Sequence, residues 1–459
     1  MLPEDRYFDP QPDQKALAQQ LYAIVRDMPI LSPHGHVDPM LFSQPDVHFA
    51  NPSALLFQKD HYILRMLHSQ GVPYEVLLSQ DQPDRAWEVF ARHFYLFRGT
   101  PSGLWLTHEL DMVFGITEPL NEHSAERIYT RIDANLASAE MTPRRLFKKF
   151  NLEVLATTDA ASDPLTSHQV LQDSGWDGRV IPTFRPDDVI GITSRGWIER
   201  VTALHHLAGL TVSDFRSYLS AIERRRETFK QLGATATDIG VLSPKVHRLA
   251  PSEANRIYQA GLKGEVGEQD AENFIAHMLF ELARMSSEDG LVMQIHPGVL
   301  RNHDPQVFAR FGGDMGFDFP VRTEFTRNLQ PLLADFGHHP NFRLILFTVD
   351  ESTYSRELAP LAGVYPAVRL GSPWWFLDSW HGIRRYFEAV LETAGLHNTA
   401  GFVDDTRAFL SIPARHDLWR RACANWVAGL LIRKMIGEAD GQEMMKDLAH
   451  RLAKAAYHL

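Results

Sequence analysis

The sequence has little cysteine: Cys423 is the only one among 459 residues. A single thiol can form neither an internal disulfide nor a metal cage of several thiolates. Long apolar runs are also lacking, because no stretch reaches the ~18 residues of a membrane-spanning helix. The acidic N-terminal segment has no apolar core of a signal peptide. These absences predict a cytoplasmic protein with no membrane partner.

Positive charge is in deficit as well. The chain has 46 Lys and Arg against 57 Asp and Glu, a formal net charge of −11. Nucleic-acid binding depends on cationic side chains that neutralise phosphates, so the composition argues against a nucleic-acid partner. A local arginine cluster could still bind a small anion. With 44% hydrophobic and 22% charged residues, the chain is not a disordered one and can bury a sizeable core.

Eight short, largely apolar runs that end in polar residues are spread along the chain. Continuous apolar stretches of this kind are typical of strands buried on both faces. Helix-like segments such as 274–285 and 384–393 separate most of them, which predicts parallel βα units. Eight units predict an α/β fold of the (β/α)8 TIM-like barrel type, as one unit over residues 1–459. The runs are 29–36, 152–159, 179–185, 234–240, 291–296, 342–350, 367–370 and 401–405.

One interval between these runs is too long for a loop. Residues 38–150, between the first and second strands, have a mainly helical pattern. We predict a helical insertion subdomain that lies over the mouth of the barrel. The segment 196–232 is similar on a smaller scale and contains Glu223-Arg-Arg-Arg-Glu227, which we expect to be a solvated helix face.

A histidine pair, His34-Gly-His36, ends the first predicted strand. Residues i and i+2 of an extended segment point to the same side, so both imidazoles can face one ion. Asp404-Asp405 ends the eighth strand, which neighbours the first in a closed barrel, and only one of these two aspartates should face the histidines. Imidazole and carboxylate together suit zinc and related ions. Satisfied or surface histidines and an exposed acidic turn are the alternative, but the joint placement favours a metal site.

Further motifs follow in a specific order and spacing. They are His34-Gly-His-Val-Asp-Pro39, Asp60-His-Tyr-Ile-Leu-Arg65, Trp105-Leu-Thr-His-Glu-Leu110, Thr157-Thr-Asp159, Arg185-Pro-Asp187, Gly298-Val-Leu-Arg-Asn302, Gly316-Phe-Asp318, Gly371-Ser-Pro-Trp-Trp-Phe376, Asp405-Thr-Arg407 and Arg415-His416. From about residue 29 to the C-terminal region, the chain resembles the uronate isomerase (glucuronate isomerase) family of the amidohydrolase superfamily. It departs from the family pattern at Ser32-Pro33, Gly35 and Ile239, where the family has Asp, Cys and His.

The resemblance implies a reversible aldose–ketose isomerisation of D-glucuronate to D-fructuronate, and of D-galacturonate to D-tagaturonate. It implies metal-assisted proton transfer between C2 and C1, although a hydride shift is not distinguished by the sequence. His34, His36 and Asp405 would hold one divalent ion, with Zn2+ favoured and Mn2+, Fe2+, Co2+ or Ni2+ also compatible. Asp405 would also be the base, with a metal-bound hydroxide as its rival. Tyr62 would stabilise the enediolate and His61 would orient the sugar.

The resemblance also implies how the sugar acid is bound. The planar fork of arginine pairs with both oxygens of a carboxylate, and Trp374 and Trp375 are apolar plates suited to a sugar face. The arginines at matching positions are Arg185, Arg301, Arg407 and Arg415. His296 and Asp159, which end the fifth and second predicted strands, should lie just outside the metal ligands, or His296 could be a weak ligand of a second metal. The expected partners are a small sugar acid and further copies of the chain.

Two other functions fit parts of the pattern. One is a metal-dependent hydrolase of the same superfamily, acting on a lactone or amide of a sugar acid. Such hydrolases generally take a Lys or His ligand from the fourth strand, and residues 234–240 contain neither. The other is a catalytically dead barrel that binds sugar acids. It would tolerate loss of the ligands, yet His34, His36 and Asp405 are all present, which favours the isomerase.

Overall fold

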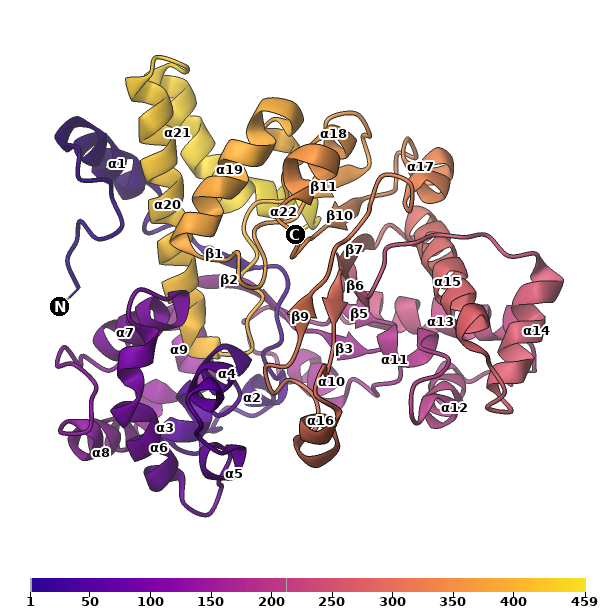
Figure 1. The fold of residues 1–459 in the computed structure, drawn as a ribbon, viewed down its shortest axis with the longest axis horizontal. Coiled ribbons are helices and arrows are strands. Elements are labelled where there is room, and N and C mark those ends of the chain that lie inside the picture. The colour runs from indigo at the N-terminus through magenta and orange to yellow at the C-terminus, as the bar shows by residue number, and fades with distance from the viewer. Residues whose placement is uncertain (1, 212) are drawn as a thin grey trace.

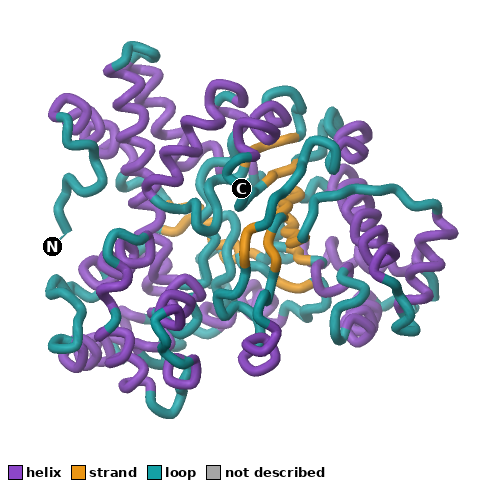
Figure 2. Tube along the Cα trace, viewed as in Figure 1, coloured by secondary structure: helices purple, strands orange, loops and turns teal. Residues whose placement is uncertain are grey.

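The computed structural model describes residues 2–211 and 213–459. Strands lie at the centre and helices surround them, in an α/β fold with parallel sheets (Figures 1 and 2). The strands are β1 (Ile30–Ser32), β2 (Leu152–Ala156), β3 (Asp159–Ala160), β4 (Val180–Ile181), β5 (Phe184–Arg185), β6 (Ala236–Val241), β7 (Val292–Pro297), β8 (Val299–Leu300), β9 (Phe319–Pro320), β10 (Leu344–Leu346) and β11 (Val368–Leu370).

The parallel strands follow one continuous order. One sheet has the order β1-β2-β4 and the other the order β11-β10-β7-β6-β5-β3, while β8 and β9 form a separate antiparallel hairpin. The stretch from β2 to β3 lies beside the stretch from β4 to β5, and backbone hydrogen bonds between them continue from Leu155 to Ala161. The two sheets therefore join, and neighbouring parallel strands follow each other along the chain, as the sequence predicts for βα units.

The segment 401–405, expected as the eighth strand, does not form a strand, although the structure describes all of it. Its backbone leaves the extended region at both ends, with a φ of 70° at Gly401 and 40° at Asp405. The expectation is wrong because these two residues turn the chain. The flanks of the segment still contact Leu370 of β11 and His36, which lies after the end of β1, through two backbone hydrogen bonds, from Ala400 N to Leu370 O (2.7 Å) and from His36 N to Thr406 O (2.9 Å).

Helices connect the parallel strands and pack around them. The predicted helices 274–285 and 384–393 are confirmed and are longer than expected. The long α15 ends at Gly290, whose φ of 77° is the left-handed conformation that commonly closes a helix. These helices are α10 (Thr166–Asp173), α11 (Asp187–Ile190), α12 (Trp197–Ala208), α13 (Phe215–Gln231), α14 (Pro251–Gly261), α15 (Glu268–Asp289), α16 (Pro305–Phe311), α17 (Gln330–Phe336), α18 (Ala359–Ala362) and α19 (Trp380–Ala394).

The arginine run in α13 is only in part the solvated face that its charge suggests. Arg225 and Arg226 are only 3% and 1% exposed. The Arg226 guanidinium pairs with Asp289 at the end of α15, at 2.6 Å. Arg225 donates to the backbone oxygens of Ala161 and Asp163. The expectation holds for the exposed Glu223, Arg224 and Glu227. It is wrong for Arg225 and Arg226, because buried acceptors from distant segments satisfy their donors and sequence spacing does not show those acceptors.

The chain between β1 and β2 is helical. Several of its helices begin with proline, which has no N–H to leave unpaired in the first turn. A hydrophobic cluster built largely from this segment includes the fully buried Leu67, Trp87 and Phe90. The helices are α2 (Met40–Ser43), α3 (Pro52–Leu56), α4 (His61–Ser69), α5 (Tyr74–Leu77), α6 (Pro83–Arg92), α7 (Pro101–Met112), α8 (Ala125–Leu136) and α9 (Pro143–Lys149), most of them indigo to purple in Figure 1.

The remaining helices come from the two ends of the chain. They are α1 (Pro12–Val25), α20 (Ile412–Ile432), α21 (Glu438–Lys446) and α22 (Leu452–Ala456). Next to α22, Tyr457 enters the protein interior, where its hydroxyl donates to Gln294 of β7 at 2.7 Å. Within the described ranges, no helix combines the length and apolar character needed to cross a membrane.

Candidate active site

A cavity of about 340 Å³ lies where the parallel strands end. This volume is at the lower end of the range of ~300–1,000 Å³ typical of small-molecule sites. Among its lining residues are nearly all of the predicted site residues: His34, His36, His61, Tyr62, Arg185, His296, Arg301, Trp374, Trp375, Asp405, Arg407 and Arg415. Asp159 is not among the described residues of the lining; its carboxylate accepts from Thr157 at 2.6 Å and pairs with His168 at 3.3 Å.

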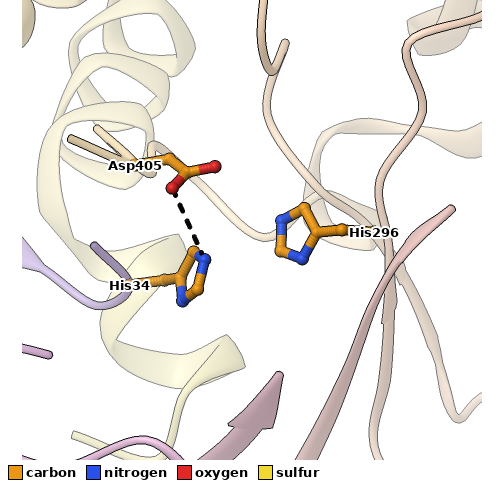
Figure 3. A group of neighbouring side chains, drawn as sticks. All are labelled: His34, His296 and Asp405. Carbon is orange, nitrogen blue, oxygen red and sulfur yellow. Dashed lines mark ion pairs between the residues drawn. The ribbon is translucent and has the colours of Figure 1, made fainter. Parts of the chain in front are cut away.

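Two histidines and one aspartate from three separate segments meet at the base of the cavity (Figure 3). His34, His296 and Asp405 each place one potential ligand atom within 4.8 Å of the other two. An oxygen of Asp405 lies 3.6 Å from Nε2 of His34 and 3.1 Å from Nε2 of His36. Both histidines of the His34-Gly-His36 motif therefore approach the same carboxylate. The neighbouring Asp404 points elsewhere, to His416 at 3.0 Å.

The surroundings set the protonation states of these groups. Burial lowers the pKa of His34 to about 4, although the carboxylates of Asp238 and Asp405 oppose the shift. Burial alone would raise the pKa of Asp405, but the adjacent His34 and His36 outweigh it and hold this pKa far below its usual range. At neutral pH the site thus presents a neutral imidazole and a carboxylate, the donors that divalent transition metals prefer.

His296 is held in place by a carboxylate behind it. Its Nδ1 lies 2.6 Å from Asp238, which also pairs with Arg185 at 3.0 Å. The opposite nitrogen, Nε2, is buried and has no partner in the described part of the protein, and the ring stacks on His34 at 4.9 Å. A histidine that is fixed on one nitrogen and unpaired on the other is arranged as metal ligands commonly are. The residues present therefore fit a metal ion.

Tyr62 is positioned by the start of α4. Asp60 caps this helix by accepting from the Tyr62 N–H at 2.8 Å. The Tyr62 hydroxyl donates to Asp378 at 3.1 Å and accepts from the Phe376 N–H at 3.0 Å. Burial raises the pKa of Tyr62 well above its usual range, and the charge of Asp378 adds to the shift. The phenol therefore keeps its proton over the physiological range.

Arg415 supports this tyrosine from α20. Its guanidinium donates to Asp378 at 2.9 Å and lies 3.6 Å from the centre of the Trp105 ring. Such a cation–π contact is strongest where water is excluded. Arg415 and Trp105, from opposite parts of the chain, thus fix the Asp378 carboxylate that faces Tyr62.

His61 has unused hydrogen-bonding capacity. Both ring nitrogens are buried and lack a partner among the described residues. Burial lowers the pKa of His61 to about 3, and the charge of Arg407 adds to the shift. Its ring stacks on Tyr62 and meets the edge of Trp375, each at 5.0 Å. A neutral, unpaired imidazole in the lining is available to a bound molecule.

The four predicted arginines differ in exposure. The Arg415 and Arg185 side chains are 5% and 26% exposed and pair with the buried Asp378 and Asp238. The side chains of Arg301 and Arg407 are 42% and 32% exposed, at the open side of the cavity. Arg301 lies 5.0 Å from the ring centre of Trp375, which has a φ of 26° that a non-glycine residue rarely adopts. Trp374 packs against His296 at 4.7 Å.

Six lining aspartates were not predicted as site residues: Asp60, Asp238, Asp314, Asp318, Asp378 and Asp404. Asp238 and Asp378 orient His296 and Tyr62, and Asp314 pairs with Arg407. Asp238 falls within the predicted strand 234–240, so its position near a strand end was a usable signal. Asp314 and Asp378 lie in irregular loops, where no periodicity indicates which side chains face a cavity.

The chain is similar over its whole length to proteins of a known family. The sequence profile of the glucuronate isomerase family matches residues 12–457. The uronate isomerase of Nostoc punctiforme is 51% identical, with 100% of this chain and 98% of the relative covered. Crystal structures of glucuronate isomerase from Caulobacter crescentus (45% identity, TM-score 0.98, 100% and 97% covered) and of uronate isomerase from Thermotoga maritima (26%, 0.93, 100% and 99%) superpose over the whole chain. The chain belongs to the glucuronate isomerase family.

Proposed function

We propose that this protein is a uronate isomerase that interconverts D-glucuronate and D-fructuronate, and D-galacturonate and D-tagaturonate. The observation that carries the proposal is that the side chains of Asp405 and Tyr62 line the same cavity. The ionised Asp405 faces the cavity beside two histidines, and the protonated Tyr62 faces it from α4. An aldose–ketose isomerase needs such an acceptor and such a donor. The cytoplasmic location and the homo-oligomer stay predictions from the sequence.

The scaffold of the site is proposed to be a closed (β/α)8 barrel over residues 1–459. Two observations support this: the parallel strands follow the order of the chain, and the segment 399–406 contacts both β11 and His36, just after the end of β1. Residues 38–150 are proposed to form a helical subdomain over the mouth of the barrel. Its separate hydrophobic cluster and the contribution of α4 to the cavity support that placement.

One divalent ion is proposed to be held by His34, His36 and Asp405, with His296 beside it. The unpaired Nε2 of His296 and the spacing of the donor atoms support this assignment. Zn2+ is favoured, and Mn2+, Fe2+, Co2+ or Ni2+ suit the same donors. When bound, such an ion supplies Lewis acidity toward the sugar oxygens.

The protein groups account for the proton movements. A proton leaves C2 of the open-chain sugar and arrives at C1, while the carbonyl and hydroxyl groups exchange positions. Asp405 is proposed to accept and return this proton, because it is ionised and faces the cavity. Tyr62, placed by Asp378 and Arg415, is proposed to turn its single O–H from Asp378 to the developing enediolate oxygen when the sugar binds. Hydrogen bonds aimed at developing charge are a large source of catalysis.

The other lining groups are proposed to bind the sugar acid. Arg301 and Arg407 would hold its carboxylate at the open side, His61 would hydrogen-bond a hydroxyl, and Trp374 and Trp375 would pack on the ring or chain. Arg185 and Arg415 act through the aspartates that they hold. Asp159 is proposed to support the end of its strand, next to Thr158, whose hydroxyl donates to the Gly35 oxygen at 2.9 Å.

The test is direct. Purified protein is incubated with D-glucuronate or D-galacturonate, before and after chelation, and ketose formation is followed by proton NMR. We expect ketose that disappears on chelation and returns with Zn2+. No ketose from metal-loaded protein with either sugar would refute the proposal, and sugar-acid lactones would then be assayed. In deuterated water, solvent deuterium is expected at C1 of the ketose formed from the aldose, and its presence there requires proton transfer.

A further inference from the structure

Asp314 is an acidic residue of the cavity lining that lies between Arg301 and Arg407. Asp314 belongs to the connection between β8 and β9, which also carries α16 (Figure 1). One of its oxygens accepts from Nη1 of Arg407 at 3.0 Å, and the other lies 3.9 Å from Nη1 of Arg301. A carboxylate of the protein itself therefore lies between the two arginines that the proposed function assigns to a sugar acid.

The chain directly after Asp314 is firmly anchored. The hydroxyl of Tyr74 donates to the backbone oxygen of Met315 at 2.5 Å. Gly316 packs so closely on α4 that an added Cβ would lie 2.4 Å from Cβ of Arg65. Asp318 is nearly fully buried and accepts from the Asn302 N–H at 2.7 Å. These contacts do not depend on the side chain of Asp314.

The chain directly before Asp314 is open. An added Cβ at Gly312 would meet no described atom within 4 Å, and at Gly313 only the Asn302 amide oxygen, at 3.6 Å. Gly312 has a φ of 83°, which glycine adopts without strain. The Asp314 side chain is 44% exposed. Two unhindered glycines on one side and a fixed anchor on the other allow Asp314 to move away while the rest of the hairpin stays in place.

Arg301 has a second, different acidic partner. Asp318 pairs with it at 3.1 Å, and the Asp318 side chain is only 4% exposed. This buried carboxylate orients the guanidinium and cannot leave. Asp314 holds the exposed side of the same pair of arginines, where an incoming carboxylate would bind. The two aspartates thus have separate roles, one fixed and one exchangeable.

We propose that Asp314 is a built-in competitor for the substrate's carboxylate at Arg301 and Arg407. In the free site it pairs with Arg407 and approaches Arg301, and a sugar acid displaces it. Two carboxylates in one place repel, so the displaced Asp314 must move out. The inference rests on the proposed role of Arg301 and Arg407.

The test compares Asp314→Asn with Asp304→Asn in otherwise intact, metal-loaded protein. Asparagine keeps the size of the side chain and removes its charge. Asp304 lies in the same connection but only caps α16, a role that asparagine fills equally well. Binding of D-gluconate, a sugar acid that cannot isomerise, is measured by calorimetry, with D-glucitol as the neutral counterpart.

We expect Asp314→Asn to bind D-gluconate about 3- to 10-fold more tightly than wild type, while Asp304→Asn matches wild type. For a uronate substrate, KM should fall by a similar factor with kcat little changed. The preference for D-gluconate over D-glucitol should not fall below its wild-type value, because the arginines become free for the carboxylate.

The other outcomes test the competitor role of Asp314 and the proposed isomerase activity separately. Unchanged or weaker D-gluconate binding in Asp314→Asn overturns the competitor role, as does the absence of binding to both variants and wild type. Tighter binding without uronate turnover in any of the proteins refutes the proposed isomerase and leaves the competition intact. Turnover without any affinity gain refutes only the competition.

Discussion

His36 and His296 are the two candidates for the third metal-ligand position beside His34 and Asp405. The tightest group of potential donor atoms contains His296, whereas His36 has the shorter distance to Asp405, 3.1 Å. His296 already uses Nδ1 on Asp238, and its ring packs against Trp374. His296 therefore also has the arrangement of a metal ligand, with Nε2 unpaired among the described residues, and the proposed assignment of the third position to His36 rests on its shorter distance to Asp405.

Metal affinity separates the two histidines. We expect His36→Ala to lower the affinity for Zn2+ by more than about 100-fold and His296→Ala by about 10-fold, the effect of losing a supporting group. Affinity is measured by competition with a coloured chelator, and His123→Ala, at a histidine with an 88% exposed side chain, is the control. The reverse order of the two losses would make His296 the third ligand.

Single residues differ in how visible their roles are in the sequence. His34 and His36 are two positions apart at the end of a strand, so local geometry alone predicts that they share a side. Asp378 faces Tyr62 only because α4 and the loop before α19 meet in three dimensions. Asp314 becomes conspicuous only beside Arg407. Contacts between segments far apart in the chain are not encoded in any short pattern.

The N-terminus of α4 is the element that presents His61 and Tyr62 to the cavity. Asp60 caps it by accepting from the N–H groups of Tyr62 and Ile63. An aspartate cap contributes typically ~1 kcal/mol to stability, and its loss frees the first turn to fray. The direction of two proposed site residues therefore depends on one carboxylate outside the helix.

We expect Asp60→Ala to lower kcat at least about tenfold and the free energy of unfolding by ~1 kcal/mol. Asp60→Asn, which caps equally well, should keep most of the activity and stability. Uronate turnover and urea unfolding of both variants check this. Equal losses of activity in the two variants would show that the charge of Asp60, which also lines the cavity, matters more than the cap.

At the level of elements, the sequence predicts most strands and helices but not their exact ends. Apolar runs locate β2, β7 and β10, because strands buried on both faces need no other signal. The run 401–405 contains Phe402 and Val403, yet Gly401 and Asp405 turn the backbone there. Likewise, Arg226 of α13 is buried because it pairs with Asp289 of α15. In both cases tertiary contacts override a local pattern.

For the whole molecule, one buried carboxyl on α7 couples stability to pH. Burial raises the pKa of Glu109 to about 8; the nearby Asp60 adds to the shift and Arg415 opposes it. In the unfolded chain the same group has an ordinary pKa of about 4.5. Between these values the unfolded state has lost the proton and the folded state keeps it, so rising pH favours unfolding over this window.

We therefore expect Glu109→Gln to gain stability relative to wild type as the pH rises from 5 to 8. The gain is at most about 1.4 kcal/mol for each pH unit and levels off above pH 8, where both states are ionised. Urea unfolding of both proteins at several pH values measures the difference. A difference that is constant with pH would mean that Glu109 titrates normally in the folded protein.

The hydrogen bond from His36 N to Thr406 O has a consequence for the order of folding. It joins segments from opposite ends of the chain, and the proposed metal ligands His34 and Asp405 lie directly beside it. Bringing the two ends of the chain together costs more chain entropy than forming a local helix, and contacts between residues distant in sequence form slowly. On refolding from denaturant, the helical circular dichroism signal should thus return first, and the capacity to bind a sugar acid should be the last property that the molecule regains.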